Sequence, residues 1–196
     1  MKKILLLLAL TTAYSVAQCQ LDKGVWLAGG SGSFYSYNQK FNSQYYNSDI
    51  EYKEIDLSIS IGYFIIDKLA VGLSPSFSYL NGYIEGQGYS FDPTRYSIAP
   101  FARYYFLNKE KQFNLVADAR YSFGFLKWPH PPRDKGTINN FSIMAGPEVF
   151  FNSSVGMELL MGYSIKKEQM NGGNFYRDVR KGFQASVGFQ IHLEKE

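Results

Sequence analysis

Apolar and polar residues alternate with a period of two over most of this chain. Near the C-terminus, the stretch GFQASVGFQIHL (182–193) has apolar residues at odd positions and glycine or polar residues at even ones. Such alternation predicts a β-strand with one apolar and one polar face. The pattern recurs, less clearly in the first segment, and predicts eight strands: 24–37, 55–64, 69–79, 96–106, 113–125, 141–151, 155–165 and 182–193.

The connections between these segments alternate in length. Short turns follow the second, fourth and sixth segments, and four long loops follow the others, at 38–49, 81–93, 126–140 and 166–181. An even number of strands, with turns short on one side and long on the other, is typical of an outer-membrane barrel. We therefore predict an all-β fold, a closed eight-stranded antiparallel up-and-down transmembrane β-barrel with both termini in the periplasm.

A soluble lipocalin-like cup would alternate in the same way, so the composition of the polar face decides between the two folds. That face is rich in glycine, serine and alanine, which a water-exposed sheet surface disfavours. Small residues suit the crowded lumen of an eight-stranded barrel. The apolar face should then contact lipid, and its representatives are Ile59, Phe77, Phe189 and Ile191.

Six charged residues also lie on the small-residue face, and we expect them to form a structural cluster that plugs the lumen. They are Asp56, Arg103, Asp118, Arg120, Glu148 and Glu158. If Phe151 pairs with Val155, Glu148 lies opposite Glu158, and two facing carboxylates need a cation. Arg103 and Arg120, the only arginines in the predicted lumen, should supply it.

Three prolines, Pro75, Pro100 and Pro147, fall inside predicted strands. A proline cannot donate a ladder hydrogen bond, and a closed barrel has no free edge to hold it. We therefore expect local β-bulges at these positions.

The first residues have the features of a secretory signal peptide. Lys2 and Lys3 precede a short apolar run, and Ser15-Val16-Ala17 offers a cleavage site. We expect a signal peptide at 1–17 and one barrel domain at 18–196. Cys19 is the only cysteine, so no intramolecular disulfide can form.

The chain resembles the small outer-membrane β-barrel proteins of Gram-negative bacteria, including the OmpA/OmpX-like and PorT-like barrels. The resemblance rests on GYFIIDKLAVGLSPSFSY (62–79), on IAPFARYYF (98–106) and on the final strand. It implies a location in the outer membrane and says little about activity.

The sequence contains no group of residues with the spacing of a catalytic or metal site. His192 is expected to fill the lumen, and His130 lies in a proline-rich loop with no paired nucleophile. We expect no catalytic residues, no metal and no cofactor, and the mild +3 formal charge does not indicate nucleic-acid binding.

The expected function is therefore structural, adhesive or an interaction role through four extracellular loops. The expected partners are outer-membrane lipid, lipopolysaccharide and a protein bound by the loops, with the chain itself a monomer. Two alternatives are a narrow, porin-like pore for small solutes and a lipid-modifying outer-membrane enzyme.

Overall fold

The structure is a computed structural model, which describes residues 21–42, 47–84, 88–108, 111–127, 135–171 and 176–193. The expected signal peptide, Cys19 and His130 lie outside the described residues. Nine strands are present in the described part: β1 (Trp26–Asn42), β2 (Asn47–Ile66), β3 (Leu69–Ile84), β4 (Tyr89–Phe91), β5 (Thr94–Tyr105), β6 (Phe113–Lys127), β7 (Lys135–Phe150), β8 (Val155–Asn171) and β9 (Tyr176–Leu193).

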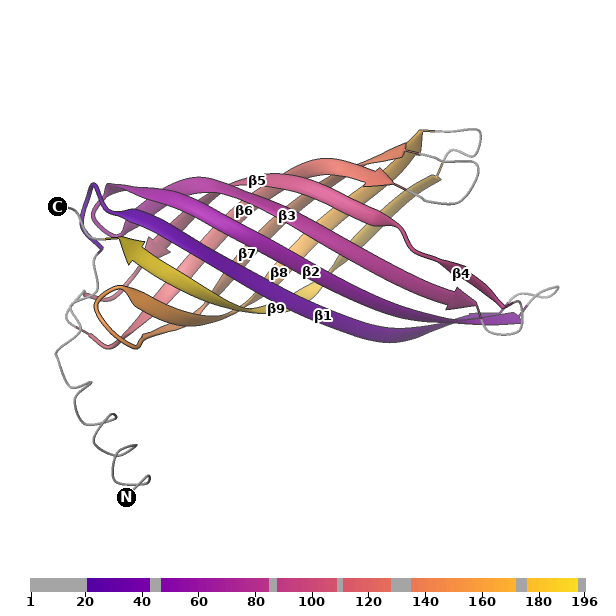
Figure 1. Ribbon diagram of the computed structural model, residues 1–196, viewed down its shortest axis with the longest axis horizontal. Coiled ribbons are helices and arrows are strands. Elements are labelled where there is room, and N and C mark those ends of the chain that lie inside the picture. Colours follow the sequence, from indigo (N-terminus) through magenta and orange to yellow (C-terminus); the bar gives the residue numbers. More distant parts are fainter. Residues whose placement is uncertain are drawn as a thin grey trace, which may run out of the picture.

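Eight of these strands close into an antiparallel barrel, as the sequence predicts. The order around the barrel is β1-β2-β3-β5-β6-β7-β8-β9, and β9 returns to pair with β1, where Trp26 lies opposite Leu193. The ninth strand, β4, is a three-residue addition that pairs with the end of β3. Figure 1 shows the strands strongly tilted around one elongated barrel.

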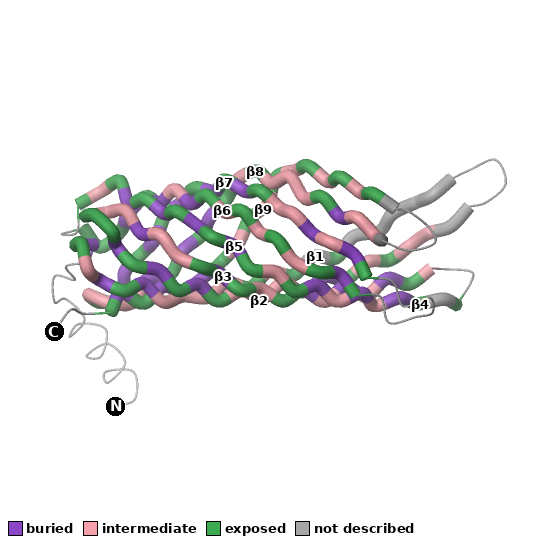
Figure 2. Tube along the Cα trace, turned by 90° about the horizontal axis from the view of Figure 1, so that it is seen from above, coloured by how far each residue is buried: buried purple, intermediate pink, exposed green. Residues whose placement is uncertain are grey.

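The alternating pattern sorts side chains between an outer and a lumenal face, and Figure 2 shows exposed and buried residues alternating along the strands. On the outer face, Ile59, Phe77, Phe189 and Ile191 are exposed, with Ile59 at 62% and Phe189 at 53% of the maximum. Exposed apolar side chains surround the barrel and form the outer belt, which ends at charged residues such as Lys53, Lys127 and Lys167. An apolar surface of this extent needs a lipid environment.

The strands extend much further than the sequence analysis predicts. β2 begins at Asn47, and β8 continues to Asn171, so much of the predicted long loops is strand. The predicted ends were wrong because they followed the edge of the apolar pattern. An antiparallel ladder needs only backbone hydrogen bonds, which continue equally well where both faces are polar.

The expected β-bulges at Pro75, Pro100 and Pro147 are also wrong. The register of each hairpin is the same before and after its proline, and only the ladder pairs around the proline are missing. Beside Pro75, the Ser74 hydroxyl donates to the Ile59 carbonyl over 2.9 Å. A side chain thus replaces the missing donor, and no extra residue has to be inserted.

The barrel wall is incomplete between its first and last strands. β1 pairs with β9 only from Trp26 to Gly32, opposite Leu193 to Val187. Among the described strands, residues 33–42 of β1 pair only with β2, and residues 176–186 of β9 pair only with β8. We call this unpaired part the seam. In Figure 1, β1 to β4 run to one side of it, and β6 to β9 run to the other.

No described segment forms an apolar helix of the length needed to cross a bilayer.

Candidate functional site

The lumen is the candidate site. Its end beside the short turns, which we call the periplasmic end after the expected orientation, is filled by apolar and aromatic side chains. Leu27, Phe64, Tyr105, Phe150 and His192 are all fully buried. The His192 ring lies 5.8 Å from the Phe64 ring, 5.6 Å from the Tyr105 ring and 5.5 Å from the Phe150 ring. We call these five residues the floor. They close the lumen in a region where the sequence analysis expected small, polar and charged residues.

Above the floor, Arg103 binds two carboxylates inside the lumen. Its Nε lies 2.9 Å from Asp118 Oδ2, and its Nη1 lies 2.8 Å from Glu158 Oε2. All three side chains are at most 2% exposed. Arg120 also pairs with Asp118, and its guanidinium lies 5.2 Å from the Phe101 ring. Each buried charge therefore has a partner of opposite sign, which burial in a low dielectric requires.

The two glutamates of the predicted pair have different partners. Glu148 and Glu158 are register partners across β7 and β8, as the sequence predicts. Glu158 binds Arg103, whereas Glu148 Oε1 lies 3.3 Å from Nε2 of His192. A glycine makes space for each carboxylate. A Cβ at Gly156 would collide with Glu148, and one at Gly188 would lie 2.9 Å from Glu158 Oε1.

The structure places five of the six predicted charges at this level, and we call these five with His192 the lower cluster. They are Arg103, Asp118, Arg120, Glu148 and Glu158. Asp56 lies elsewhere, nearer the extracellular end, where its Oδ2 accepts a 3.4 Å hydrogen bond from the Ser33 hydroxyl. Among the described residues, no cation pairs with Asp56.

A second set of charges, which the sequence analysis missed, lies further out in the lumen. We call it the upper cluster, and it consists of Glu54, Arg95, Lys166, Glu168 and Arg180. Arg95 Nη1 lies 2.7 Å from Glu54 Oε1, and Arg95 Nε lies 2.9 Å from Glu168 Oε1. Arg95 therefore connects β5 to β2 and to β8. The prediction that Arg103 and Arg120 are the only lumenal arginines is wrong.

The strand pattern contained a signal for this upper cluster. Glu54 has the same parity as Asp56, and Arg95 has the same parity as Arg103, so both continue the lumenal face of their strands. They were missed because the predicted strands ended too early.

Glu168 lies beyond the outer belt. The residue before it, Lys167, faces outward, is exposed and marks the end of the belt on β8. Burial raises the pKa of its carboxyl, but the nearby Lys166, Arg95 and Arg180 lower it more. The net pKa of Glu168 is below its ordinary value, so its charge stabilises the folded state at neutral pH.

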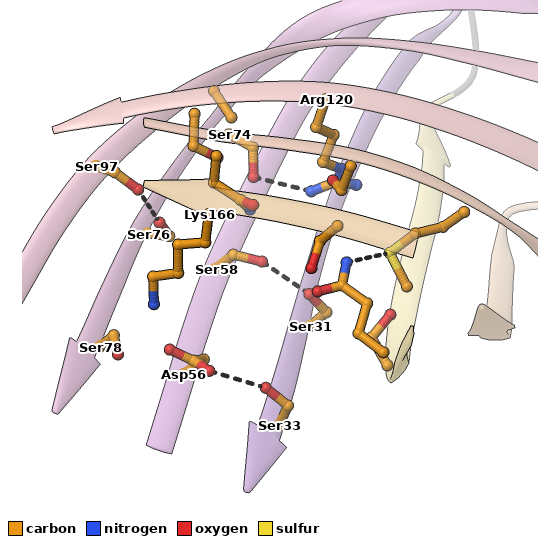
Figure 3. Close-up of a pocket in the computed structure, with 18 of the residues that line it drawn as sticks. Ser31, Ser33, Asp56, Ser58, Ser74, Ser76, Ser78, Ser97, Arg120 and Lys166 are labelled. Carbon is orange, nitrogen blue, oxygen red and sulfur yellow. Dashed lines mark hydrogen bonds between the residues drawn. The ribbon is translucent and has the colours of Figure 1, made fainter. Parts of the chain in front are cut away.

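Between the two clusters lies a cavity of about 440 Å³ lined by eleven serines, which we call the chamber. They are Ser31, Ser33, Ser58, Ser74, Ser76, Ser78, Ser97, Ser122, Ser142, Ser164 and Ser186. Figure 3 shows hydrogen bonds across neighbouring strands, including Ser31 with Ser58 at 2.7 Å and Ser76 with Ser97 at 2.6 Å. Each hydroxyl both donates and accepts, so the walls suit a polar, uncharged occupant.

No metal-binding group of three His, Cys, Asp or Glu residues occurs in the part of the chain that the structure describes. His192 is buried in the floor, with Glu148 as its partner.

The comparisons with known proteins give a likeness in fold. No protein-family profile and no curated sequence matches this chain. Its structure is similar to that of the Neisserial surface protein A (NspA), with a TM-score of 0.53 and 19% identity, over 86% of this chain and 97% of that one. It is also similar to the outer membrane protein OprG from Pseudomonas aeruginosa, with a TM-score of 0.52 and 11% identity, over 89% and 98%.

These likenesses agree with the closed antiparallel barrel that the strand pairing shows. Together with the outer belt, they support a location in the outer membrane of a Gram-negative cell.

Proposed function

We propose that this protein is a closed barrel of the outer membrane, with a structural or interaction role at the cell surface rather than a role as a channel. The observation that carries the proposal is the floor, whose five side chains are all fully buried across the lumen. The lower cluster lies directly above it, so an ion would have to displace both packed rings and paired charges to pass through.

The extracellular half supports the surface role. The hairpins continue beyond the outer belt, and β2 and β9 are 20 and 18 residues long, well beyond the roughly 10 residues that span a bilayer. The side chains of this protruding part, many of them charged or aromatic, would contact lipopolysaccharide and a protein partner. The long connections, of which only parts are described, are the expected contact surface, and the chain acts as a monomer.

Conductance across a planar bilayer tests the closed lumen. Purified, folded chain should give no discrete openings over a wide range of voltages, in bilayers where a general porin does. Heat-modifiable gel mobility confirms that the inserted chain is folded. Discrete openings from the folded chain would overturn the proposal and favour the small-solute pore.

Protease accessibility in intact cells tests the surface role. Cleavage should occur in the long connections of intact cells, and in the short turn around residues 151–154 only after permeabilisation. Cleavage of the short turn in intact cells would reverse the orientation and contradict the surface role.

A further inference from the structure

We propose that the seam is a lateral entrance from the outer leaflet, through which the chamber binds the uncharged, hydroxyl-bearing head group of a single-chain amphiphile. The first support is the lining of the chamber. A cavity confined to the lumen would contact inward-facing side chains and the backbone of the paired wall. This one also contacts Phe183 and Ala185, which face outward from the part of β9 that has no described β1 partner. The chamber therefore extends through the barrel wall at the seam.

A second cavity lies on the outer surface of the same part of the wall. It is lined by Ile59, Phe77, Val187 and Phe189, and it has Gly30 and Gly32 at its base. The two cavities share wall residues, among them Gly32, Leu57 and Ser58. The apolar groove lies over the last paired residues of the boundary, Gly32 and Val187, and therefore borders the seam at which the polar chamber opens. This arrangement matches the two ends of an amphiphile.

The seam itself favours an occupant, because it leaves backbone groups unpaired within the outer belt. Phe34 and Phe183, on the two sides of the seam, are exposed at 64% and 91%, so the opening lies at the level of the lipid. Unpaired backbone N–H and C=O groups are strongly unfavourable in hydrocarbon, where no water can bind them. Hydroxyl groups of a bound head group would donate to and accept from these edges.

The charges of the chamber favour a neutral head group over an ionic one. Four of the five cations that line the chamber are already paired with carboxylates, so an ionic head group would compete with existing ion pairs; they are Arg95, Arg120, Lys166 and Arg180. The fifth, Lys181, is exposed and has the parity of the outward face. The acceptors that remain are Asp56, which has no cation among the described residues, and the buried Oδ1 of Asn140, which accepts no described hydrogen bond. Both can accept a hydrogen bond from a hydroxyl group.

The ligand would enter the chamber from the outer leaflet, and its alkyl chain would stay in the membrane. The upper cluster lies across the chamber toward the extracellular end, and the floor closes it toward the periplasm. The cavity volume of about 440 Å³ lies within the usual range of about 300–1,000 Å³ for small-molecule sites.

Photolabelling in phospholipid vesicles tests the site. The probe is decyl β-D-glucoside with a diazirine at the end of its alkyl chain, added to the reconstituted full chain. We expect saturable labelling at the groove, around Ile59, Phe77 and Phe189, that excess unlabelled decyl β-D-glucoside displaces. Labelling spread evenly over the outer belt would overturn the proposal.

One substitution fills the groove without disturbing the fold. At Gly32 a Cβ would meet its nearest atom, Leu57 Cδ2, at an ordinary distance of 3.5 Å. Gly32→Leu should lower the saturable labelling about tenfold. Ala145→Leu, which adds one carbon atom fewer on the outer face of β7 away from the seam, should leave it unchanged. Equal labelling of both variants would contradict a site at the seam.

Head-group selectivity and closure of the seam give two further tests. Decanoate and decyltrimethylammonium should displace the probe much less than the glucoside does, and equal displacement would overturn the choice of a neutral head group.

In a Cys19→Ser background, an oxidised Ser33→Cys/Ser186→Cys pair should abolish labelling, and reduction should restore it. A control pair, Ala28→Cys/Ile191→Cys, joins positions that are already paired and should have no effect. Undiminished labelling of the cross-linked seam would refute the entrance.

Discussion

The periplasmic and extracellular halves of this barrel have the same strands but differ in how completely they are closed. In the periplasmic half, each strand pairs with two neighbours, and the lumen contains the floor and the lower cluster. In the extracellular half, the seam separates β1 from β9, and the lumen contains the chamber. Side chains point alternately inward and outward in both halves. The size of the inward side chains makes the difference, since rings and arginine fill a lumen that serines leave open.

The largest loss of stability is expected from substitution of Arg103, which lies at the centre of the lower cluster in the periplasmic half. Arg103→Met would leave buried Asp118 with one cation, Arg120, and buried Glu158 with none, at a cost of about 4 kcal/mol in the free energy of unfolding. Urea unfolding in bilayers would measure it. Arg120→Met is the matched control, because Arg120 is partly exposed and Asp118 would keep Arg103. Equal stability of Arg103→Met and the native chain would contradict a structural lower cluster.

The floor should show a somewhat smaller effect. Phe64→Ala removes a fully buried ring that packs against Tyr105 and His192, and it should cost about 3 kcal/mol. Phe64→Leu, which keeps most of the volume, should cost about 1 kcal/mol. The temperature at which the gel mobility changes would rank the two variants. A Phe64→Ala protein as heat-resistant as the Phe64→Leu protein would show that the floor does not pack as described.

Acidification should lower the free energy of unfolding through the upper cluster, and by less than the substitutions in the lower cluster and the floor. Because the folded pKa of Glu168 is lowered, its contribution is complete above the ordinary glutamate pKa of about 4.3 and is lost as pH falls through the lowered value. Glu168→Gln should therefore be less stable than the native chain at pH 7, by about 1 kcal/mol. The difference should shrink below about pH 4. A difference independent of pH between 7 and 3 would contradict the charge pairing.

The chamber should be the least sensitive region. Ser76→Ala/Ser97→Ala removes both partners of a 2.6 Å hydrogen bond, leaves no unpaired group and should change stability by at most about 0.5 kcal/mol. Chemical unfolding of the double variant checks this. A loss comparable to that of Phe64→Ala would mean that the serines stabilise the extracellular half as packing does.

The sequence alone predicted the features that depend on local pattern. Period-two alternation placed Ile59 and Phe189 on the outer face, and the short turn at 151–154 predicted the pairing of Glu148 with Glu158. Those features follow from the geometry of a single strand or hairpin, which neighbouring residues determine.

Features that depend on distant strands could not be predicted in this way. The contact of Arg95 with Glu168 joins β5 to β8 across the lumen, and the pairing of His192 with Glu148 joins β9 to β7. The seam could not be predicted from the sequence for another reason. The segment WLAGGSGSF in β1 has no clear face, and nothing in a single strand shows where its last partner ends.

Hydrogen exchange at individual backbone amides of β1 and β9, measured in a bilayer, tests the contrast between the halves most directly. Amides that bond across the β1–β9 boundary should be protected from Trp26 to Gly32 and from Val187 to Leu193. Beyond these residues, amides facing the seam should exchange rapidly, while those directed to β2 and β8 stay protected. Continuous protection along the whole boundary to the extracellular end would show a fully closed wall and contradict the account.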